Sequence, residues 1–538
     1  MGAKRPPARY APPPPCPLPY AADGSWTDET SLAARRCVRL ALRASLGWWR
    51  AACAPRPAPP LDVDATLCRL RGVSARAVLT NMLLLRSSGG RLSAAILIDP
   101  SDERGPMRHW PARPVAALQQ LAELQSRIDA HEYPPLPDFV AVLNPHDSPY
   151  QMDSNNWCGL APILSNSRVT GEHRDLLMPD FSFAPLSYLT NMLEANMSAA
   201  LSVPQGWPAE RQAIYAAGKR RRWREKEPSL FWRGGETHVQ RREYAEAISS
   251  GRVKLGGGVK ADVVLCGAHC SLEQGVRPED WCAHQQLLSL PGHSFAVGFK
   301  YTMLCSSTVV RGAHPAAGCV GCPRVFEQWW SVGLKEGEHY LASRRPDDLP
   351  SVVGDAAAQP DSSELIAARG SEYTYRVLSP AFINEYWHTL LSGYASLFSG
   401  EGRVESAAAA CKLPHRNHPQ NERERVCMRG THGMCQFKLV GEEELVPLPT
   451  PAEIAAQCRT TAGMQASALR MGRGVEGALY RRFATILPMR ITGRGNASEA
   501  AVAALQSWLQ GDNKKAPRDA PKSQREEKHA THSAHGKH

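Results

Sequence analysis

The sequence lacks several features that would assign it quickly to a class of protein. Its 538 residues contain no run of about 18 uninterrupted apolar residues, so no transmembrane helix is predicted. The N-terminal stretch has no apolar core of the kind found in secretory signal peptides, so no signal peptide is predicted. The closing Gly536-Lys537-His538 is no usual retention signal. The sequence contains no internal repeat of the kind that builds solenoids or propellers.

Signatures of metal and nucleic-acid binding are also scarce. Cys319 and Cys322 have the spacing of a zinc half-site, but no second pair matches it, so zinc, disulfides and plain thiols all stay open. The net charge is +11, yet no zinc finger, RNA-recognition signature or repeated basic helix accompanies it. The basic run 219–226 suits either an anion site or a solvated helix end. Nucleic-acid binding is therefore weakly supported, and no nucleic-acid partner is expected.

Short apolar runs that alternate with helical patterns predict an α/β fold. Phe139–Leu143, Asp262–Cys266 and Thr308–Val310 have the pattern of buried parallel strands. Arg91–Asp99 is a predicted strand after a Ser-Gly turn, and Pro114–Ala130 is a predicted amphipathic helix. Strands that alternate with helices are typical of parallel sheets covered by helices.

Two polar segments near these elements are candidates for chemistry. Asn144-Pro-His-Asp147-Ser-Pro149 follows a predicted strand, where ligands of open α/β sheets bind, and a carboxylate there can accept a proton from a hydroxyl. A turn formed by Asp147 is the alternative. Pro179-Asp-Phe181-Ser182-Phe183 holds two aromatic rings near prolines, which suits a partly exposed acceptor groove or buried packing.

Two further segments combine small residues with a cation. Phe231-Trp-Arg233-Gly234-Gly235 ends an apolar run and precedes a helix-like stretch; the glycines let the backbone approach a ligand, and arginine suits a diphosphate. Ser294–Gly298 opens a helix that carries Lys300, the layout of a nucleotide-diphosphate pocket. The alternative for the 231–235 segment is a surface turn, and the alternative for the 294–298 segment is a helix cap.

In their order along the chain, these segments resemble the protein O-glucosyltransferase (capsule-associated-protein-like) family, glycosyltransferase family 90, in its plant and algal branch. The resemblance covers about residues 137–398. The matching positions are Asn144, Asp147 and Pro149; Pro179, Phe181, Ser182 and Phe183; Phe231, Trp232, Arg233, Gly234 and Arg241; Ser294 to Ser307, with Lys300 and Cys305; and Ala368 to Tyr394.

The resemblance implies a GT-B-like α/β fold with two Rossmann-like lobes facing a cleft and disordered termini. The expected organisation is a Pro-rich, largely irregular segment with one possible helix (1–60), an acceptor lobe (61–205), a UDP-sugar lobe (206–378), a helix crossing back (379–400), an extension of unknown role (401–510) and a disordered basic tail (511–538).

The resemblance further implies an inverting O-glycosyltransferase that moves glucose or xylose from a UDP-sugar to a hydroxyl of a protein or glycan, with Asp147 as general base. No metal or other cofactor is expected, because cationic side chains would stabilise the leaving diphosphate. The expected donor-binding residues are Arg233, Gly234, Gly235, Thr237, Arg241, Ser294, Phe295, Ala296, Val297, Gly298 and Lys300. The expected acceptor-binding residues are Pro179, Phe181, Ser182 and Phe183.

Two alternatives stay open: an inactive carbohydrate- or protein-binding module of the same family and, with less support, a basic nucleic-acid-binding protein. Glu236 and Gly298 stand where animal members of the family have arginine, which leaves the donor sugar open. The family usually works in the lumen of the endoplasmic reticulum or Golgi, and the resemblance implies that compartment. No targeting signal is readable, so a cytosolic location is the alternative.

Overall fold

The computed structural model describes residues 16–52, 66, 82–96, 112–151, 160–169, 171–185, 206–266, 276–312, 314–316, 319–324, 326–397 and 446–448. All of them belong to one compact unit, Met1–Thr492. Of the predicted extension 401–510 only residues 446–448 are described, and the predicted tail 511–538 lies outside these ranges. Within the ranges no helix is both long and apolar enough to cross a bilayer.

Five parallel strands form one sheet in the second half of the chain. Their order is β14-β10-β9-β7-β8, and every neighbouring pair is parallel. The predicted strands at 262–266 and 308–310 are confirmed, because both apolar runs lie within strands of this sheet. The bounds are β7 Glu227–Gly235, β8 Lys260–Cys266, β9 His284–Ser289, β10 Thr308–Gly312 and β14 Leu341–Ser343.

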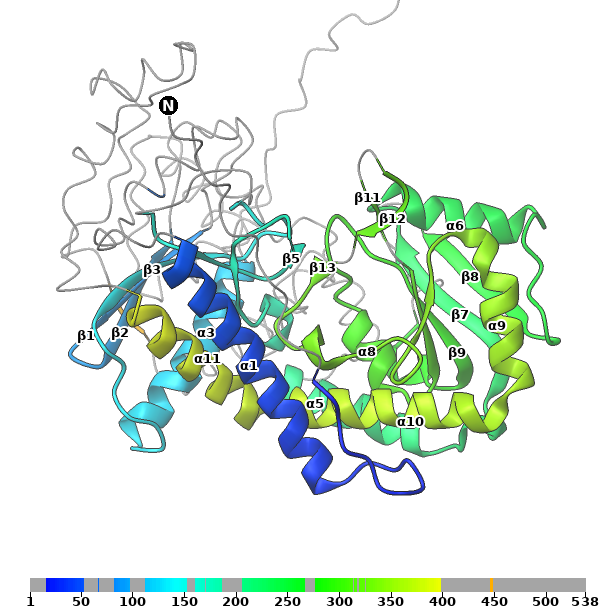
Figure 1. The fold of residues 1–538 in the computed structure, drawn as a ribbon, viewed down its shortest axis with the longest axis horizontal. Coiled ribbons are helices and arrows are strands. Elements are labelled where there is room, and N and C mark those ends of the chain that lie inside the picture. The colour runs from blue at the N-terminus through cyan, green and yellow to red at the C-terminus, as the bar shows by residue number, and fades with distance from the viewer. Residues whose placement is uncertain are drawn as a thin grey trace, which may run out of the picture. The chain divides into compact units, whose positions relative to one another are not determined.

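Helices cover both faces of this sheet. Successive side chains of a strand point to opposite faces, so neighbouring residues of one strand pack in two different hydrophobic clusters. Leu230 and Val310 face a cluster with α6 (Val239–Ser249) and α9 (Leu349–Ala358). Phe231 and Val309 belong to the other cluster, on the side of the remaining helices (Figure 1). These helices are α5 Trp207–Lys219, α7 Pro278–Trp281, α8 Phe299–Leu304 and α10 Pro360–Val377. The predicted α/β class is confirmed.

The sheet in the first half of the chain is mixed. Its order is β15-β2-β1-β3-β4-β6, with β3, β4 and β6 parallel and the remaining pairs antiparallel. A two-residue turn at Gly89-Gly90, with φ of +57° and +78°, joins β1 to β2 as a hairpin. The lobe predicted there as Rossmann-like thus combines three parallel strands with an antiparallel hairpin. The bounds are β1 Leu83–Ser88, β2 Arg91–Ile96, β3 Phe139–Asn144, β4 Ile163–Ser165, β6 Leu176–Leu177 and β15 Val446–Pro447, with α3 Ala112–Asp129 before β3.

The N-terminal segment contributes a long helix, α1 (Asp28–Ala52), where the sequence predicted a largely irregular segment with one possible helix. Val38, Leu42 and Leu46 repeat every four residues and are buried, so one stripe of the helix faces the core. This stripe contacts α10 and α11 (Pro380–Ala395), beside which α1 runs in Figure 1. Residues 28–52 are therefore helical with one face in the core, which the Pro-rich composition of the flanking sequence did not predict.

Candidate functional site

Asp147 sits in a loop at the carboxyl end of β3 that Asn144 holds in place. The buried Asn144 amide donates to Ser148 O at 2.8 Å and to Ser165 Oγ at 3.0 Å. Its Oδ1 accepts the His146 N–H at 3.0 Å, which closes a turn within the loop. The side chain of Asp147 keeps 30% of its surface exposed. The loop is thus rigid at its base, and its carboxylate reaches solvent.

Arg113, which the sequence analysis did not single out, holds this carboxylate. Its Nη1 donates to Asp147 Oδ1 at 2.8 Å from the first turn of α3. Its guanidinium carbon lies 4.4 Å from the centre of the Phe181 ring, a cation–π contact. Arg113 is only 8% exposed, so its stacked guanidinium fixes one carboxylate oxygen of Asp147. The backbone carbonyl of Asp147 accepts from Ser167 Oγ at 3.3 Å.

The aromatic segment 179–183 is buried and forms a 3₁₀ turn, η2 (Phe181–Phe183). Asp180 caps the turn by accepting the Ser182 N–H at 2.8 Å, and its Oδ2 accepts from Gln328 Nε2 at 3.0 Å. The Phe183 ring packs edge-on against Trp207 at 5.1 Å. The partly exposed loop that the sequence suggested is therefore absent at these described residues, because the turn is part of the core.

Lys300 is also buried, with 2% of its surface exposed. Its ammonium donates to Ser182 Oγ and lies 5.0 Å from the centre of the Phe183 ring. Burial lowers the pKa of Lys300 to about 8, against the attraction of Asp180 and Glu210. In this structure the lysine joins α8 to the 181–183 turn instead of facing a ligand pocket.

Arg233 pairs with a carboxylate on the neighbouring strand. Its Nη2 donates to Asp262 Oδ1 at 2.6 Å, and its Nη1 donates to Asp262 O at 2.8 Å. Gly234 is required beside it, since a Cβ atom would lie 2.4 Å from the Trp232 ring. Gly234 thus serves packing of the strand end in this structure.

Arg241 ties together the carboxyl ends of two strands. From α6 it donates to Gly235 O at 2.9 Å, at the end of β7, and to Pro291 O at 2.9 Å and Leu290 O at 3.2 Å, just after β9. The Thr237 hydroxyl lies beside this junction, 3.2 Å from where a Cβ on Gly292 would lie. Arg241 therefore shapes the sheet edge where a ligand is expected.

A pocket opens at this edge of the parallel sheet. Among the predicted donor-binding residues it contains Ser294, Phe295 and Ala296, whereas neither Arg233 nor Lys300 lines it. Val297 packs against the Phe181 cluster and Gly298 is the N-cap of α8. The full lining is Ser289, Pro291, Ser294, Phe295, Ala296, Phe299, Arg311, Gly312, Phe326 and Gln328.

A chain of side-chain contacts joins this pocket to the Asp147 loop. Asp147 pairs with Arg113, and Arg113 stacks on Phe181. The centre of the Phe181 ring lies 6.4 Å from that of Phe295, which lines the pocket. Three segments far apart in the sequence therefore meet in one region: the 144–149 loop, the 181–183 turn and the 294–298 loop.

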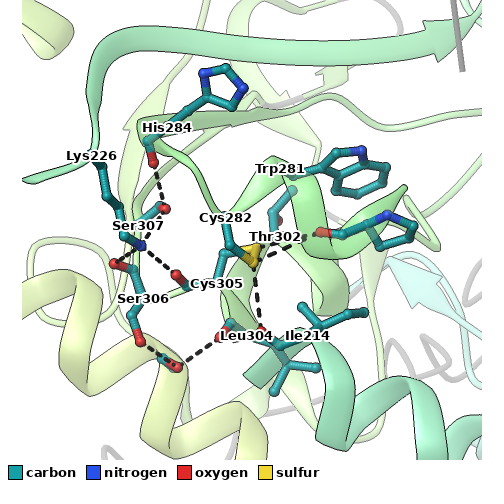
Figure 2. The surroundings of a disulfide bond; sticks show 12 residues. Ile214, Lys226, Trp281, Cys282, His284, Thr302, Leu304, Cys305, Ser306 and Ser307 are labelled. Carbon is teal, nitrogen blue, oxygen red and sulfur yellow. Dashed lines mark hydrogen bonds between the residues drawn. A yellow bond between two sulfur atoms is a disulfide. The ribbon is translucent and has the colours of Figure 1, made fainter. Parts of the chain in front are cut away.

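A disulfide and a lysine hold the far end of α8, which starts beside the pocket. Cys282 at the end of α7 is bonded to Cys305 at the end of α8 (Figure 2). Lys226 Nζ donates to Cys305 O at 2.6 Å, Ser306 O at 2.7 Å and Ser307 Oγ at 3.1 Å. Burial lowers the pKa of Lys226 to about 7. These bonds fix the helix terminus by supplying donors to its free carbonyls.

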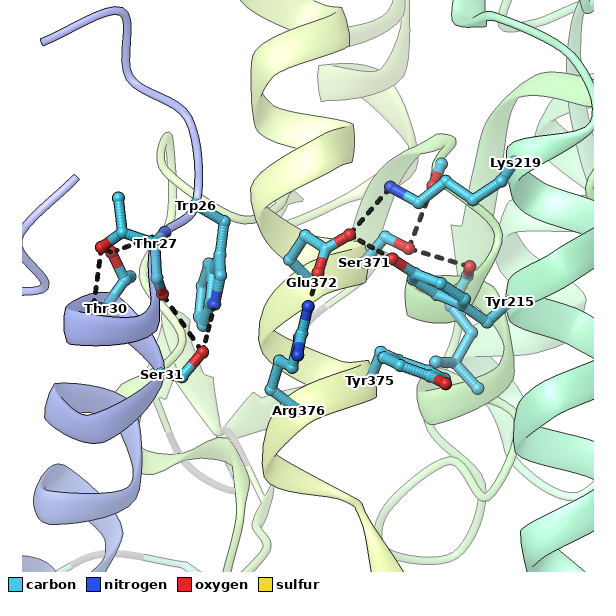
Figure 3. Close-up of polar contacts among 12 residues, drawn as sticks. Trp26, Thr27, Thr30, Ser31, Tyr215, Lys219, Ser371, Glu372, Tyr375 and Arg376 are labelled. Carbon is cyan, nitrogen blue, oxygen red and sulfur yellow. Dashed lines mark hydrogen bonds and ion pairs between the residues drawn. The ribbon is translucent and has the colours of Figure 1, made fainter. Parts of the chain in front are cut away.

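The basic run 219–226 is partly used inside the protein. Glu372 of α10 accepts from Lys219 at 3.0 Å and from the Tyr215 hydroxyl, while the rings of Tyr215 and Tyr375 stack at 3.7 Å (Figure 3). Arg224 pairs with Asp361, also on α10. The run therefore docks α5 and the following 3₁₀ turn on α10, which agrees with its interpretation as a helix end.

The zinc half-site falls on a hairpin strand, β12 (Cys319–Arg324), which pairs with β11 (His314–Ala316). Across the described ranges, no three His, Cys, Asp or Glu residues come together in a way that could hold a metal ion.

The known proteins to which this chain is similar include several named as O-glucosyltransferases. An O-glucosyltransferase rumi homolog of Anopheles gambiae is 26% identical over 276 residues, which cover 49% of this chain and 63% of that protein. Protein O-glucosyltransferase 1 of Homo sapiens is 24% identical over 280 residues, covering 49% of this chain and 64% of that protein. The chain thus spans a little under two thirds of the length of the curated relatives it matches.

The family model of glycosyl transferase family 90 matches residues 109–457, a range that holds the Asp147 loop, the 181–183 turn, the parallel sheet and its pocket. Because this match covers more than half of the chain, the chain belongs to glycosyl transferase family 90.

Proposed function

We propose that the chain is an inverting O-glycosyltransferase that moves glucose or xylose from a UDP-sugar to a hydroxyl group of a protein or glycan. The names of its relatives support O-glucosyl transfer as the reaction class. The observation that carries the proposal is the contact path Asp147–Arg113–Phe181–Phe295, which links a solvent-reaching carboxylate to a pocket at the strand ends. Such strand ends are where open α/β sheets bind ligands.

In the proposed reaction, Asp147 accepts the proton of the acceptor hydroxyl as its oxygen attacks the anomeric carbon. The new carbon–oxygen bond forms while the bond to the diphosphate breaks, and UDP leaves with the electron pair. Arg113 holds Oδ1 of Asp147 at 2.8 Å, which leaves Oδ2 to face the acceptor. A single displacement on the face opposite UDP inverts the anomeric centre. General-base catalysis of this kind contributes about 10²–10⁴-fold in rate.

The proposal includes a GT-B arrangement, with the UDP-sugar bound by the five-stranded parallel sheet and the acceptor on the side of the mixed sheet. It also includes action in the lumen of the endoplasmic reticulum or Golgi. The disulfides Cys16–Cys37 and Cys282–Cys305 support that compartment, because disulfides persist where the redox potential is oxidising.

The alternative to an enzyme is an inactive binding module. It is favoured by the contacts that Arg233 makes with Asp262 and Lys300 makes with Ser182, because these occupy two cations expected to bind the donor. Release of UDP from a panel that includes UDP-glucose and UDP-xylose, together with calorimetric binding of UDP, separates the two. Turnover of a UDP-sugar supports the enzyme. Binding of UDP without release from any donor supports the inactive module, and absence of both contradicts a UDP-sugar site.

A further inference from the structure

Arg311 is the arginine that lines the pocket at the carboxyl end of the parallel sheet. It occupies the fourth position of β10, next to Gly312, and is half-buried. Because β10 lies between β9 and β14, its carboxyl end is flanked on both sides by strands of the same direction. Gly312 cannot be replaced without movement, since a Cβ atom would lie 2.6 Å from Leu290. The strand end beside Arg311 is therefore closely packed.

The guanidinium of Arg311 is oriented without a charged partner. Its central carbon lies 4.6 Å from the centre of the Phe299 ring and 5.6 Å from that of Tyr340. Its Nη2 donates to Phe326 O at 3.2 Å. In the described part of the chain no carboxylate pairs with Arg311, whereas Arg233 is paired with Asp262. One nitrogen and two rings thus hold the guanidinium, and its other N–H groups remain for a ligand.

We propose that Arg311 binds the diphosphate of the donor nucleotide in this pocket. The inference rests on the proposed function and adds to it a cation that the sequence analysis did not assign. An arginine fork binds two phosphate oxygens at once, and stacking on a ring limits its freedom before the ligand arrives. Lys300 and Arg233 do not line the pocket, so Arg311 supplies there the positive charge expected of them.

Titrations of the full chain with UDP and with uridine test this assignment. UDP binding is followed by calorimetry and uridine binding by saturation-transfer NMR. Since a charge-assisted phosphate contact is lost, we expect R311Q to weaken UDP binding by about 10- to 100-fold. Uridine binding should change by less than about twofold, because the nucleoside lacks the phosphates. R311K, which keeps the charge but not the fork, should lie between the wild type and R311Q.

The control is R224Q, because Arg224 is an exposed arginine of η4 (Trp223–Glu225) on the amino side of β7. It should bind UDP as the wild type does. UDP binding by R311Q and R311K at wild-type strength would overturn the role of Arg311 while leaving the proposed function intact. Equal weakening of UDP and uridine would also overturn it, since Arg311 would then support only the shape of the pocket. A wild-type chain that fails to bind UDP would contradict the proposed function itself.

Discussion

We predict that protonation of His339 lowers the stability of this protein in acid. Only 1% of its surface is exposed. Its Nδ1 accepts the Lys335 N–H at 3.1 Å, so Nε2 carries the proton and donates to the Tyr20 hydroxyl at 2.9 Å. The neutral ring thereby anchors the N-terminal segment. Burial lowers the pKa of His339 to about 4; nearby Lys335 and Arg369 act in the same direction and Glu338 opposes them.

The sign and size of the effect follow from this pKa. The pKa of the unfolded histidine is about 6.5, so between pH 6.5 and 4 the unfolded chain binds a proton that the native ring refuses. The free energy of unfolding therefore falls as the pH falls through this window. Each pH unit is worth about 1.4 kcal/mol, which gives a loss of about 3 kcal/mol at pH 4.

Urea unfolding at pH 7.5, 6, 5 and 4 measures this loss when the wild type is compared with His339→Gln. Glutamine keeps hydrogen-bonding groups but does not titrate. We expect the wild type to be the more stable protein at pH 7.5 and its advantage to shrink by about 3 kcal/mol at pH 4. His293→Gln, at an exposed histidine, serves as control. A difference between wild type and His339→Gln that does not vary with pH would refute the reasoning.

Three further predictions concern the Cys282–Cys305 disulfide, two glycines of opposite φ, and the arginine that pairs with Asp147. Replacing Cys282 and Cys305 with serine should cost about 3 kcal/mol in urea unfolding, from a closed loop with a sequence separation of 23; an unchanged midpoint would mean that the bond adds no stability. Gly298→Ala should raise the free energy of unfolding by about 0.4–1 kcal/mol, since φ is −65° and a Cβ would have 3.8 Å to its nearest neighbour. Gly257→Ala, at φ +65°, should lower it by at least about 1 kcal/mol, and equal effects of the two would contradict the geometry. Arg113→Lys should lower kcat for sugar transfer by more than it changes KM for the donor; a change confined to KM would remove the arginine from positioning the base.

Local sequence patterns predicted much of the fold. The apolar runs at 139–143, 262–266 and 308–310 lie within strands, and those at 139–143 and 308–310 are largely buried, as continuous apolar runs predict. α11 begins at Pro380, a residue suited to the first turn of a helix, and the Ser379 hydroxyl before it accepts the Phe382 N–H at 3.4 Å. Such signals lie within a few residues of the element they define.

The partners within the site depend on distant contacts, which no local pattern encodes. Lys300 was expected at a diphosphate, yet its partner is Ser182, 118 residues away. Arg113 and its partner Asp147 are 34 residues apart on different elements. Arg311 did carry a usable signal, because it is a polar residue that directly follows the apolar run of a predicted strand, where ligands of parallel sheets bind.

The most direct test of the proposed catalysis is the rate of UDP release from the preferred UDP-sugar by Asp147→Asn. The matched control is Asp138→Asn, because Asp138 precedes the same strand at its amino end and accepts the Gly89 N–H at 2.8 Å. Thermal unfolding checks that both variants are folded. We then predict that the rate of UDP release falls by about 10²–10⁴-fold in Asp147→Asn and stays near that of the wild type in Asp138→Asn. A wild-type rate in Asp147→Asn would contradict the assignment of Asp147 as the general base.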